Sequence, residues 1–164
     1  MTFLQTKRLL LRRANEGDLD ALHSIMADRE TMRYWSTPPH TDRETTRKFL
    51  AGLIPGPDMQ GDEFVIEHHG AVIGKIGIWQ QAEIGFILSR TFWRQGLATE
   101  ALNAFIGYAF AGATFYLTAD VDPRNRASLA LLQRVGFAET GRAEQTWQIG
   151  GEWSDSVYLR LDRP

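Results

Sequence analysis

The feature that most constrains this fold is a strand-like run that leads through a glycine turn directly into an apolar helix pattern. Residues 83–88, EIGFIL, form the strand-like run. After Gly96, apolar residues recur at spacings of three and four: Leu97, Ala98, Ala101, Leu102, Phe105, Ile106, Ala109 and Phe110. This spacing predicts a helix over residues 97–110. A strand joined to a helix in this way is typical of α/β domains.

The turn itself, residues 95–98, has little side-chain bulk. Gly96 has no Cβ to block a close approach, and the following helix directs free N–H groups and the positive end of its dipole toward this point. Such a turn suits a phosphate group. A glycine before a helix is also common in an ordinary strand-to-helix connection, so the turn alone leaves both interpretations open.

The composition excludes several classes of protein. The 164 residues, 43% hydrophobic and 23% charged, suit a single domain over residues 1–164. The net charge of −2 gives no indication of a general nucleic-acid or membrane-surface binder. Cysteine is absent, and the four histidines lack the spacing of a zinc site, so we expect no disulfide, cysteine nucleophile or metal. Without a bilayer-length apolar run or a signal-peptide core, a cytoplasmic protein is expected.

The first 61 residues are expected to contain one strand and two helices. Residues 8–13, RLLLRR, are predicted as the strand. Asn15 is placed to cap a helix whose apolar face consists of Leu19, Leu22, Ile25 and Met26. Residues 29–40 are expected to form a loop or a short irregular helix. Thr41, at the start of the sequence TDRE, is expected to open the second helix as a capping box.

The rest of the chain is expected to be a series of strands interrupted by two helices. Besides the helix described above, the predicted elements are strands over residues 63–68, 71–79, 83–88 and 114–121, a helix over residues 125–135, and two strands within residues 137–161. Gly136 lies where a helix usually ends, and Gly150 and Gly151 form a good hairpin turn. The order βααβββαβαββ predicts an α/β (α+β) fold with a central mixed, twisted β-sheet flanked by helices.

A second informative stretch is residues 122–137, DPRNRASLALLQRVGF. Asn125 and Ser128 are three residues apart, which places them on one face at the start of the predicted helix. The alternative interpretation makes Asn125 a plain N-cap and Ser128 a solvated residue of the first turn. For Asn125, taken alone, this alternative is the better explanation.

Several segments together resemble the GCN5-related N-acetyltransferases, the GNAT superfamily, which move an acetyl group from acetyl-CoA to an amine. The matching segments are TKRLLLRRA, AEIGFIL, FWRQGLATEAL, NRASLALLQRVGF and GGEWSDSVYL. The resemblance covers nearly the whole chain, implies the GNAT fold, and is greatest to the RimJ/RimL branch of ribosomal-protein N-terminal acetyltransferases. The superfamily's pyrophosphate loop usually reads Gln/Arg-x-x-Gly-x-Gly/Ala. Gly96 and Ala98 match this pattern, whereas Trp93 stands at its first position.

The resemblance implies how acetyl-CoA would bind. Its pyrophosphate would be cradled by the backbone of Arg94, Gln95, Gly96, Leu97, Ala98 and Thr99. Its pantetheine arm would pair, like an extra strand, with the backbone of Ile87, Leu88 and Ser89. Asn125 would touch the pantetheine or the acetyl region, and Ser128 and Leu132 would lie beside the thioester sulfur.

The resemblance also suggests two catalytic residues. Many superfamily members have a tyrosine that protonates the departing thiolate, but this chain has Leu132 there, and in the RimJ/RimL-like pattern Ser128 takes the role. The amine must be neutral to attack, yet only roughly a tenth of an α-amine, and far less of a lysine amine, is neutral at pH 7. Glu83 is the candidate base, directly or through a water. The alternative interpretation of Glu83 is a solvated carboxylate at a strand end.

The acceptor pocket is expected between the early loop and the last hairpin. Tyr34 and Trp35 are the candidates from the loop, and Trp147 and Trp153 are those from the hairpin. Each of these aromatic residues, taken alone, is better explained by ordinary packing.

The expected reaction is acetyl-CoA-dependent acetylation of a primary amine, by direct attack in a ternary complex. The RimJ/RimL-like interpretation makes the acceptor a protein N-terminal α-amine. A small-molecule acceptor, such as an amino acid, polyamine or antibiotic, and a non-catalytic acyl-CoA-binding module are the alternatives. We expect no direct contact with nucleic acid or membrane. Arg33 or Glu144 could set the charge preference of the acceptor, and a monomer and a homodimer both remain open.

Overall fold

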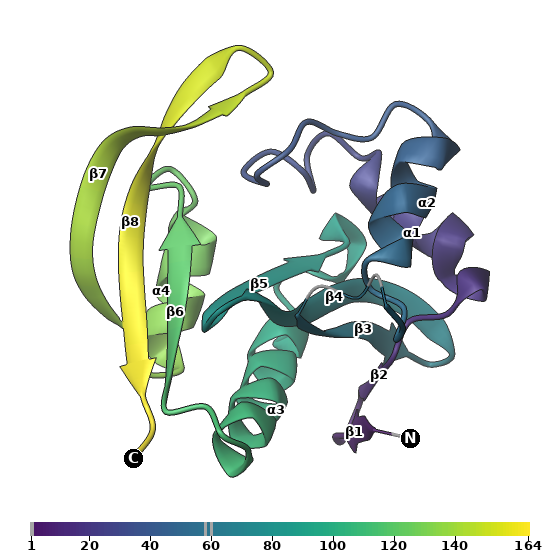
Figure 1. The fold of residues 1–164 in the computed structure, drawn as a ribbon, viewed down its shortest axis with the longest axis horizontal. Coiled ribbons are helices and arrows are strands. Elements are labelled where there is room, and N and C mark those ends of the chain that lie inside the picture. Colours follow the sequence, from purple (N-terminus) through teal and green to yellow (C-terminus); the bar gives the residue numbers. More distant parts are fainter. Residues whose placement is uncertain (1, 58, 60) are drawn as a thin grey trace.

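The computed structural model describes residues 2–57, 59 and 61–164. Its strands form one eight-stranded sheet in the order β1-β2-β3-β4-β5-β6-β8-β7 (Figure 1). The strands are β1 Phe3–Gln5, β2 Leu10–Arg12, β3 Asp62–His68, β4 Ala71–Gln80, β5 Glu83–Leu88, β6 Tyr116–Val121, β7 Ala138–Ile149 and β8 Glu152–Asp162. Only β5 and β6 are parallel neighbours, so the sheet is mixed, as predicted.

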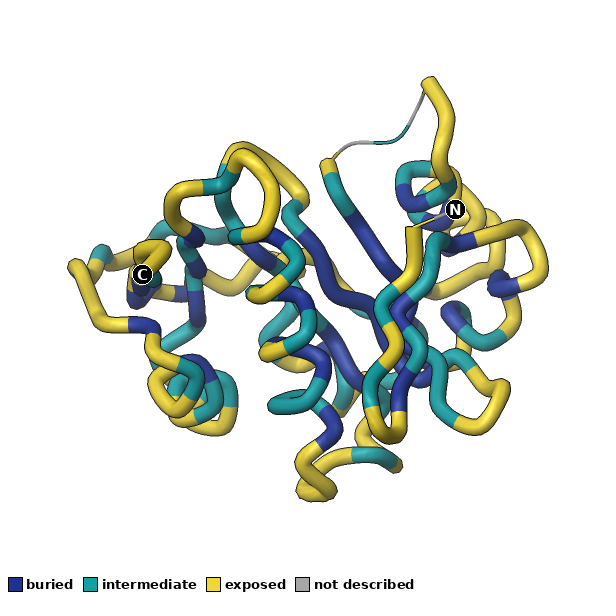
Figure 2. The backbone as a smooth tube through the Cα atoms, turned by 90° about the horizontal axis from the view of Figure 1, so that it is seen from below, coloured by how far each residue is buried: buried dark blue, intermediate teal, exposed yellow. Residues whose placement is uncertain are grey.

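Helices cover both faces of the sheet because successive side chains of a strand point to opposite sides. On one face, Leu117 and Ala119 pack in a core with residues of α3 and α4. On the other face, Val65 and Ile87 pack with residues of α1 and α2. Buried residues follow the central strands and the inner sides of the helices (Figure 2). The helices are α1 Leu19–Met26, α2 Arg43–Ala51, α3 Leu97–Ala111 and α4 Arg126–Arg134, with short 3₁₀ turns η1 Glu16–Asp18 and η2 Arg90–Phe92.

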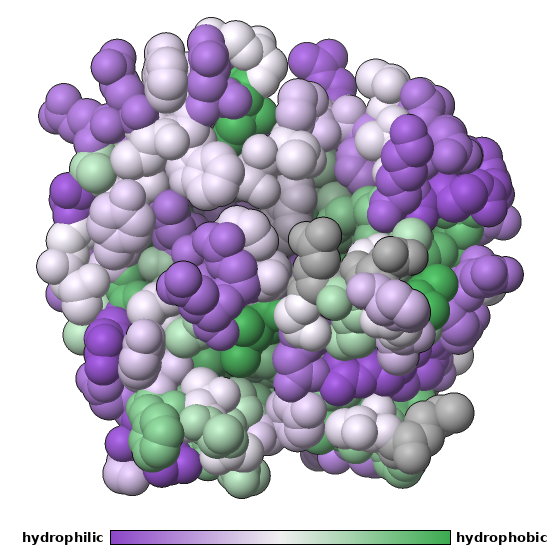
Figure 3. All heavy atoms as spheres, viewed as in Figure 1, coloured by the Kyte–Doolittle hydropathy of each residue, from purple (hydrophilic) through white to green (hydrophobic). Residues whose placement is uncertain are grey.

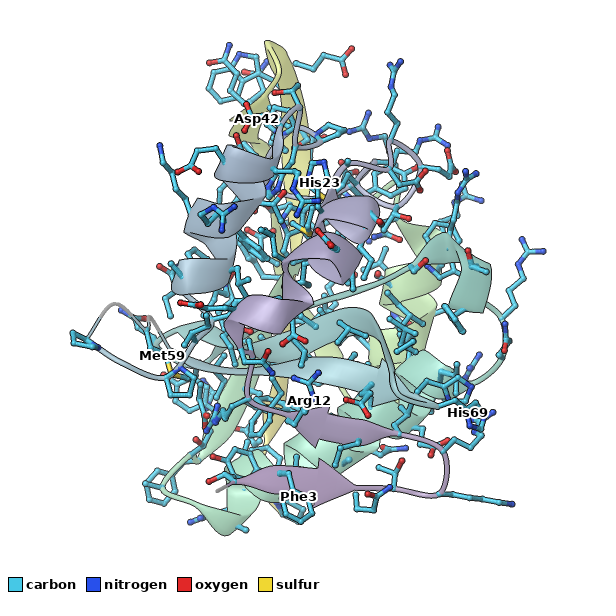
Figure 4. All side chains as sticks on the ribbon, turned by 90° about the vertical axis from the view of Figure 1, so that its right-hand side faces the viewer. Phe3, Arg12, His23, Asp42, Met59 and His69 are labelled. Carbon is cyan, nitrogen blue, oxygen red and sulfur yellow. The ribbon has the colours of Figure 1, made fainter. Side chains whose placement is uncertain are left out.

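The predicted order of elements is confirmed except at its start, where β1 is an additional strand. With three residues it is too short to show a periodic pattern, and antiparallel pairing of Phe3 with Arg12 holds it in place. The cap expected at Thr41 is wrong by one residue. The carboxylate of Asp42 accepts the hydrogen bond of the Thr45 N–H at 2.7 Å instead, and Figure 4 shows Asp42 at the start of α2.

Two other predicted turns are confirmed. The side chain of Asn15 accepts a hydrogen bond from the Gly17 N–H and caps η1, which leads into α1. Gly150 and Gly151 both have positive φ, as the two-residue turn between β7 and β8 requires. Within the described part of the chain, no helix is both long enough and apolar enough to cross a membrane.

An opening between β5 and β6 divides the sheet. These two strands pair only where Glu83 meets Thr118, and beyond that point they diverge (Figure 1). α3 follows β5 and α4 follows β6, so both helices begin after the carboxyl ends of the diverging strands. Ligands of open α/β sheets bind outside the carboxyl ends of the strands, at points where neighbouring connections lead to different sides. The bent tip of the β7–β8 hairpin leans over the upper end of the opening (Figure 1).

Candidate active site

The turn after β5 and the start of α3 have the geometry of an anion site. Gly96 is the N-cap residue with φ of 76°, in the left-handed region that favours glycine, and Arg94 also has a positive φ of 59°. No side chain among the described residues caps this end of α3, so its backbone N–H groups remain available. Arg8 lies beside the turn: its guanidinium donates to the Gln95 carbonyl at 2.8 Å and pairs with Glu100 at 2.7 Å.

The open edge of β5 differs in part from the prediction. The Ser89 N–H donates to the Ile73 carbonyl at 2.8 Å, so Ser89 is turned toward β4. Bonding alternates along an antiparallel pair, so Ile87 also faces β4, whereas Phe86 and Leu88 present their backbone groups to the opening. Of the three residues predicted to pair with pantetheine, Leu88 therefore presents its backbone groups to the opening, whereas Ile87 and the N–H of Ser89 face β4. Its carbonyl accepts a hydrogen bond from the Trp93 indole N–H at 2.7 Å.

The start of α4 brings together the other residues predicted to meet the thioester. Asn125 is the N-cap, since its side-chain oxygen accepts from the Ser128 N–H at 3.2 Å, which confirms its interpretation as a cap. The Ser128 hydroxyl is partly exposed and has no hydrogen-bond partner among the described residues. Leu132, one turn further, is fully buried in the core under β6. α4 therefore presents the partly exposed Ser128 hydroxyl at its start, whereas Leu132 is 0% exposed and contributes no accessible surface beside it.

A cavity of about 470 Å³ lies on the face of the sheet that α1 and α2 cover. It is situated between the loop that contains residues 33–37 and the β7–β8 hairpin. Its lining includes Glu83, Tyr34, Trp35 and Trp147, so the sequence-predicted base and three of the four predicted aromatic residues come together there. Trp153 is outside this lining and is 53% exposed on β8. Arg33 also lines the cavity, whereas Glu144 lines a different, smaller one. Hydrophilic side chains gather along the upper edge of the molecule (Figure 3).

Glu83 lies where β5 and β6 meet, on the floor of this cavity. The Trp79 indole N–H donates to Glu83 Oε1 at 3.0 Å. Burial raises the pKa of Glu83, the hydrogen bond from Trp79 opposes that effect, and the charge of Asp120 adds to it. A carboxylate with a raised pKa is a better proton acceptor, so Glu83 has the property that a general base needs.

A buried ion pair forms another part of the floor. Lys75 Nζ is 2.8 Å from both carboxylate oxygens of Glu63, and both side chains are only 3% exposed. Gly77 leaves room for the Glu63 carboxylate, because a Cβ there would lie 2.4 Å from it. Trp35 packs over the ammonium group at 5.6 Å. Sequence reasoning missed this pair, although a lysine inside the apolar strand sequence AVIGKIGIW was the available signal.

Asp120 is a second lining carboxylate that sequence reasoning missed. Its Oδ2 accepts a hydrogen bond from the Trp147 indole N–H at 3.0 Å. Two residues further, Asp122 pairs with Arg124, whose guanidinium packs over the ring of Tyr34 at 5.7 Å. This contact joins the early loop to the end of β6. Only the alternation within residues 116–121 could have indicated that Asp120 faces away from the core.

Comparison with known proteins establishes the family. The family model of the acetyltransferase (GNAT) domain matches residues 8–138. The chain belongs to the GNAT acetyltransferase family. The uncharacterized N-acetyltransferase p20 of Bacillus licheniformis is 30% identical to it over 170 residues, which cover 97% of this chain and 94% of that protein.

Solved acetyltransferases have the same fold. Spermidine N-acetyltransferase from Vibrio cholerae, in complex with CoA and spermine, superposes with a TM-score of 0.83 at 22% identity, covering 96% of this chain and 97% of that one. RimL, a ribosomal L7/L12 alpha-N-protein acetyltransferase in complex with coenzyme A, superposes with a TM-score of 0.85 at 21% identity, covering 98% of each chain. The predicted GNAT fold is confirmed, and this protein is an N-acetyltransferase.

In this N-acetyltransferase, the opening between β5 and β6 lies between the residues expected to hold the cofactor and the cavity that contains Glu83. The glycine turn and the start of α4 follow the carboxyl ends of the two strands, and α3 and α4 cover one face. The cavity with Glu83 lies on the other face. Glu83 and the helix that carries Ser128 are therefore on opposite faces of the sheet. This arrangement suits a reaction in which two substrates meet within the opening.

Proposed function

We propose that this N-acetyltransferase moves the acetyl group of acetyl-CoA to a primary amine by direct attack in a ternary complex. The observation that carries the proposal is the opening between β5 and β6, which separates the glycine turn from the cavity that contains Glu83. The two substrates would reach the opening from opposite faces. Their reacting atoms would then meet without a covalent acetyl-enzyme.

Acetyl-CoA would bind along the opening. Its pyrophosphate would accept hydrogen bonds from the backbone of residues 94–99, next to Arg8 and the positive end of the α3 dipole. Its pantetheine amides would pair with the free backbone groups of Phe86 and Leu88. The thioester would then reach the start of α4, where Asn125 and Ser128 lie, while Leu132 packs behind them in the core.

Proton transfer completes the proposed reaction. Glu83 accepts a proton from the acceptor ammonium, directly or through a water, and the neutral nitrogen attacks the thioester carbon. The nitrogen then releases its second proton to solvent, the C–S bond breaks, and the Ser128 hydroxyl donates a proton to the departing thiolate. Solvent reprotonates Ser128 and takes the proton from Glu83, so one proton is released overall. The products are the amide and CoA.

For the acceptor, we propose a protein N-terminal α-amine, as in the RimJ/RimL-like interpretation. The similarity in fold to RimL supports this choice, and an α-amine is already partly neutral near pH 7. A small cationic amine is the second candidate. It is favoured by the carboxylates of Glu83 and Asp120, which form no ion pair with any described residue of the cavity lining.

An acceptor panel tests the proposal. The purified protein would be incubated with acetyl-CoA and, separately, with peptides that have free N-termini, with the same peptides blocked at the N-terminus, and with small mono- and diamines. Free thiol and acetylated product would both be measured. We expect acetylation of at least one primary amine and none of a blocked peptide without lysine. Binding of acetyl-CoA without product from any amine would contradict the proposal and favour the non-catalytic binder.

A further inference from the structure

Asp120 and Glu83 are neighbouring carboxylates on the floor of the cavity. Glu83 is paired with Thr118 of β6, and Asp120 is two residues further along the same strand, so both face the same side of the sheet. A strand spacing of about 4.8 Å and a rise of about 3.3 Å per residue place their Cα atoms on the order of 8 Å apart. The opposite face of β6 is occupied by the apolar core, through Leu117 and Ala119.

Each carboxylate is oriented by a tryptophan. The indole N–H groups of Trp79 and Trp147 donate to Glu83 and Asp120, both at 3.0 Å. Asp120 Oδ1 accepts no hydrogen bond from the described residues, and neither carboxylate forms an ion pair with them. The hydrogen bonds fix the direction of each charge without neutralising it.

The basic residues of the cavity lining do not compensate this charge. Lys75 is paired with Glu63, and Arg124 is paired with Asp122. Arg33 has a side chain that is 62% exposed and lies 3.9 Å from Glu30, and the remaining lysine of the lining, at position 48, is an exposed residue of α2. An excess of negative charge therefore remains around the two oriented carboxylates.

We propose that Asp120 binds a second cationic group of the acceptor, so that preferred acceptors carry two ammonium groups. This proposal rests on acetyl transfer to a primary amine as the proposed function, and of the two acceptors considered there it favours the small cationic amine. One ammonium group lies at Glu83 and loses its proton before attack, while the other remains charged at Asp120. Aromatic faces stabilise ammonium groups, and Trp35, Trp79 and Trp147 all line the cavity. Asp120 is thus a residue that determines specificity, in addition to the proposed base.

Binding of two matched probes tests the proposal without any turnover. Calorimetry at neutral pH and low salt would compare 1,4-diaminobutane with n-butylamine, which has the same chain and one charge. We expect the wild-type protein to bind the diamine at least about fivefold more tightly, since partly buried charge pairs contribute more than exposed ones. A wild-type protein that does not bind the diamine more tightly than the monoamine overturns the proposal.

Variants assign the preference to Asp120. Asp120→Asn keeps an oxygen for the Trp147 indole and removes the charge, so the diamine should bind about as weakly as the monoamine, whose affinity should change less than about twofold. Asp120→Glu should retain the preference. Asp162→Asn makes the same change in net charge on β8, outside the cavity lining, and is the control. If Asp120→Asn lowered the affinity for the diamine and the monoamine by the same factor, with an unchanged near-UV circular dichroism spectrum, Asp120 would not be the residue that binds the second ammonium group.

Turnover distinguishes this proposal from the proposed function. With the diamine as acceptor, Asp120→Asn should raise KM and leave kcat near wild type, because the second ammonium group is bound equally in the ground state and the transition state. Absence of product from every amine would remove the proposed function, while the binding comparison would still decide the role of Asp120. A fall in kcat without a change in KM would show that Asp120 does not bind the acceptor.

Discussion

Glu83 shows how the environment of one side chain changes both reactivity and stability. Its carboxylate is partly buried where two strands meet, and burial raises its pKa despite the hydrogen bond from Trp79. The folded protein therefore binds this proton more tightly than the unfolded chain does. By linkage, the ionised carboxylate destabilises the fold once the pH exceeds the ordinary carboxyl value of 4.5, and increasingly so up to the raised value.

Substitution of Glu83 tests whether its ionised carboxylate destabilises the folded protein. Glu83→Gln removes the charge, and its amide oxygen can still accept the Trp79 hydrogen bond. Thermal unfolding followed by circular dichroism should give a Tm equal to or above that of wild type near pH 7. The advantage should be lost near pH 4, where the wild-type carboxyl is protonated. A Tm below that of wild type by the same amount at both pH values would show that burial of the ionised group has no cost.

Ser128 is the second residue whose role can be tested alone. Its hydroxyl has no partner among the described residues, so Ser128→Ala should leave the fold and acetyl-CoA affinity close to wild type. We expect kcat to fall, because the hydroxyl matters only when charge develops on the sulfur. Single-turnover kinetics with a thiol-release readout would measure the chemical step. An unchanged chemical rate would make Ser128 a solvated residue of the first turn.

At the scale of elements, the turn between β5 and α3 depends on backbone conformation. Gly96 has positive φ, and a Cβ there would lie 3.4 Å from the guanidinium of Arg8. A β-branched residue in this conformation costs roughly 1–3 kcal/mol, so Gly96→Val should lower stability and weaken acetyl-CoA binding by about tenfold or more. Gly107→Val in the same helix, where nothing lies within 4 Å, is the control. Equal acetyl-CoA affinities of the two variants by calorimetry would remove the turn from the proposed cofactor site.

The floor of the cavity offers a complementary test in β5. A Cβ at Gly85 would lie 3.8 Å from Trp79 and 3.9 Å from Trp35, which is ordinary contact, so Gly85→Val should fold. Its methyl groups would narrow the space between the two indole rings. We expect the acceptor KM to rise by about tenfold or more, while the acetyl-CoA dissociation constant changes little. A matched rise in both constants would place the acceptor elsewhere.

Across the whole molecule, elements with a long periodic pattern were predicted from the sequence and short or bent ones were not. The bounds of β5 were predicted correctly, and α3 was predicted within one residue, because strand and helix periodicity extend over the entire element. β1 was missed because three residues show no period. The bend in the last hairpin was missed because its register shift between Ala143 and Trp147 depends on Gln145 with positive φ, for which no sequence signal was recognised.

The site divides in the same way. Each short segment whose residues are close in sequence was predicted as a unit. The glycine turn was one such segment, the start of α4 was another, and both were assigned to the cofactor site. Contacts between distant strands were not, so the pairs Trp147–Asp120 and Lys75–Glu63 became visible only in the folded sheet. The sequence also could not predict which backbone groups of β5 face the opening. The register between β4 and β5 determines that those of Leu88 do and those of Ile87 do not.

The most direct test of the central proposal, that Glu83 is the base at the meeting point of two substrates, is a pH–rate profile of kcat/KM. Wild type and Glu83→Gln would be compared with one acceptor over about pH 6 to 9. General base catalysis is typically worth about 10² to 10⁴ in rate, so the variant should be slower by up to that factor near pH 7 and should recover as the free amine forms at higher pH. Two profiles that coincide over the whole range would contradict the assignment of Glu83 as the base.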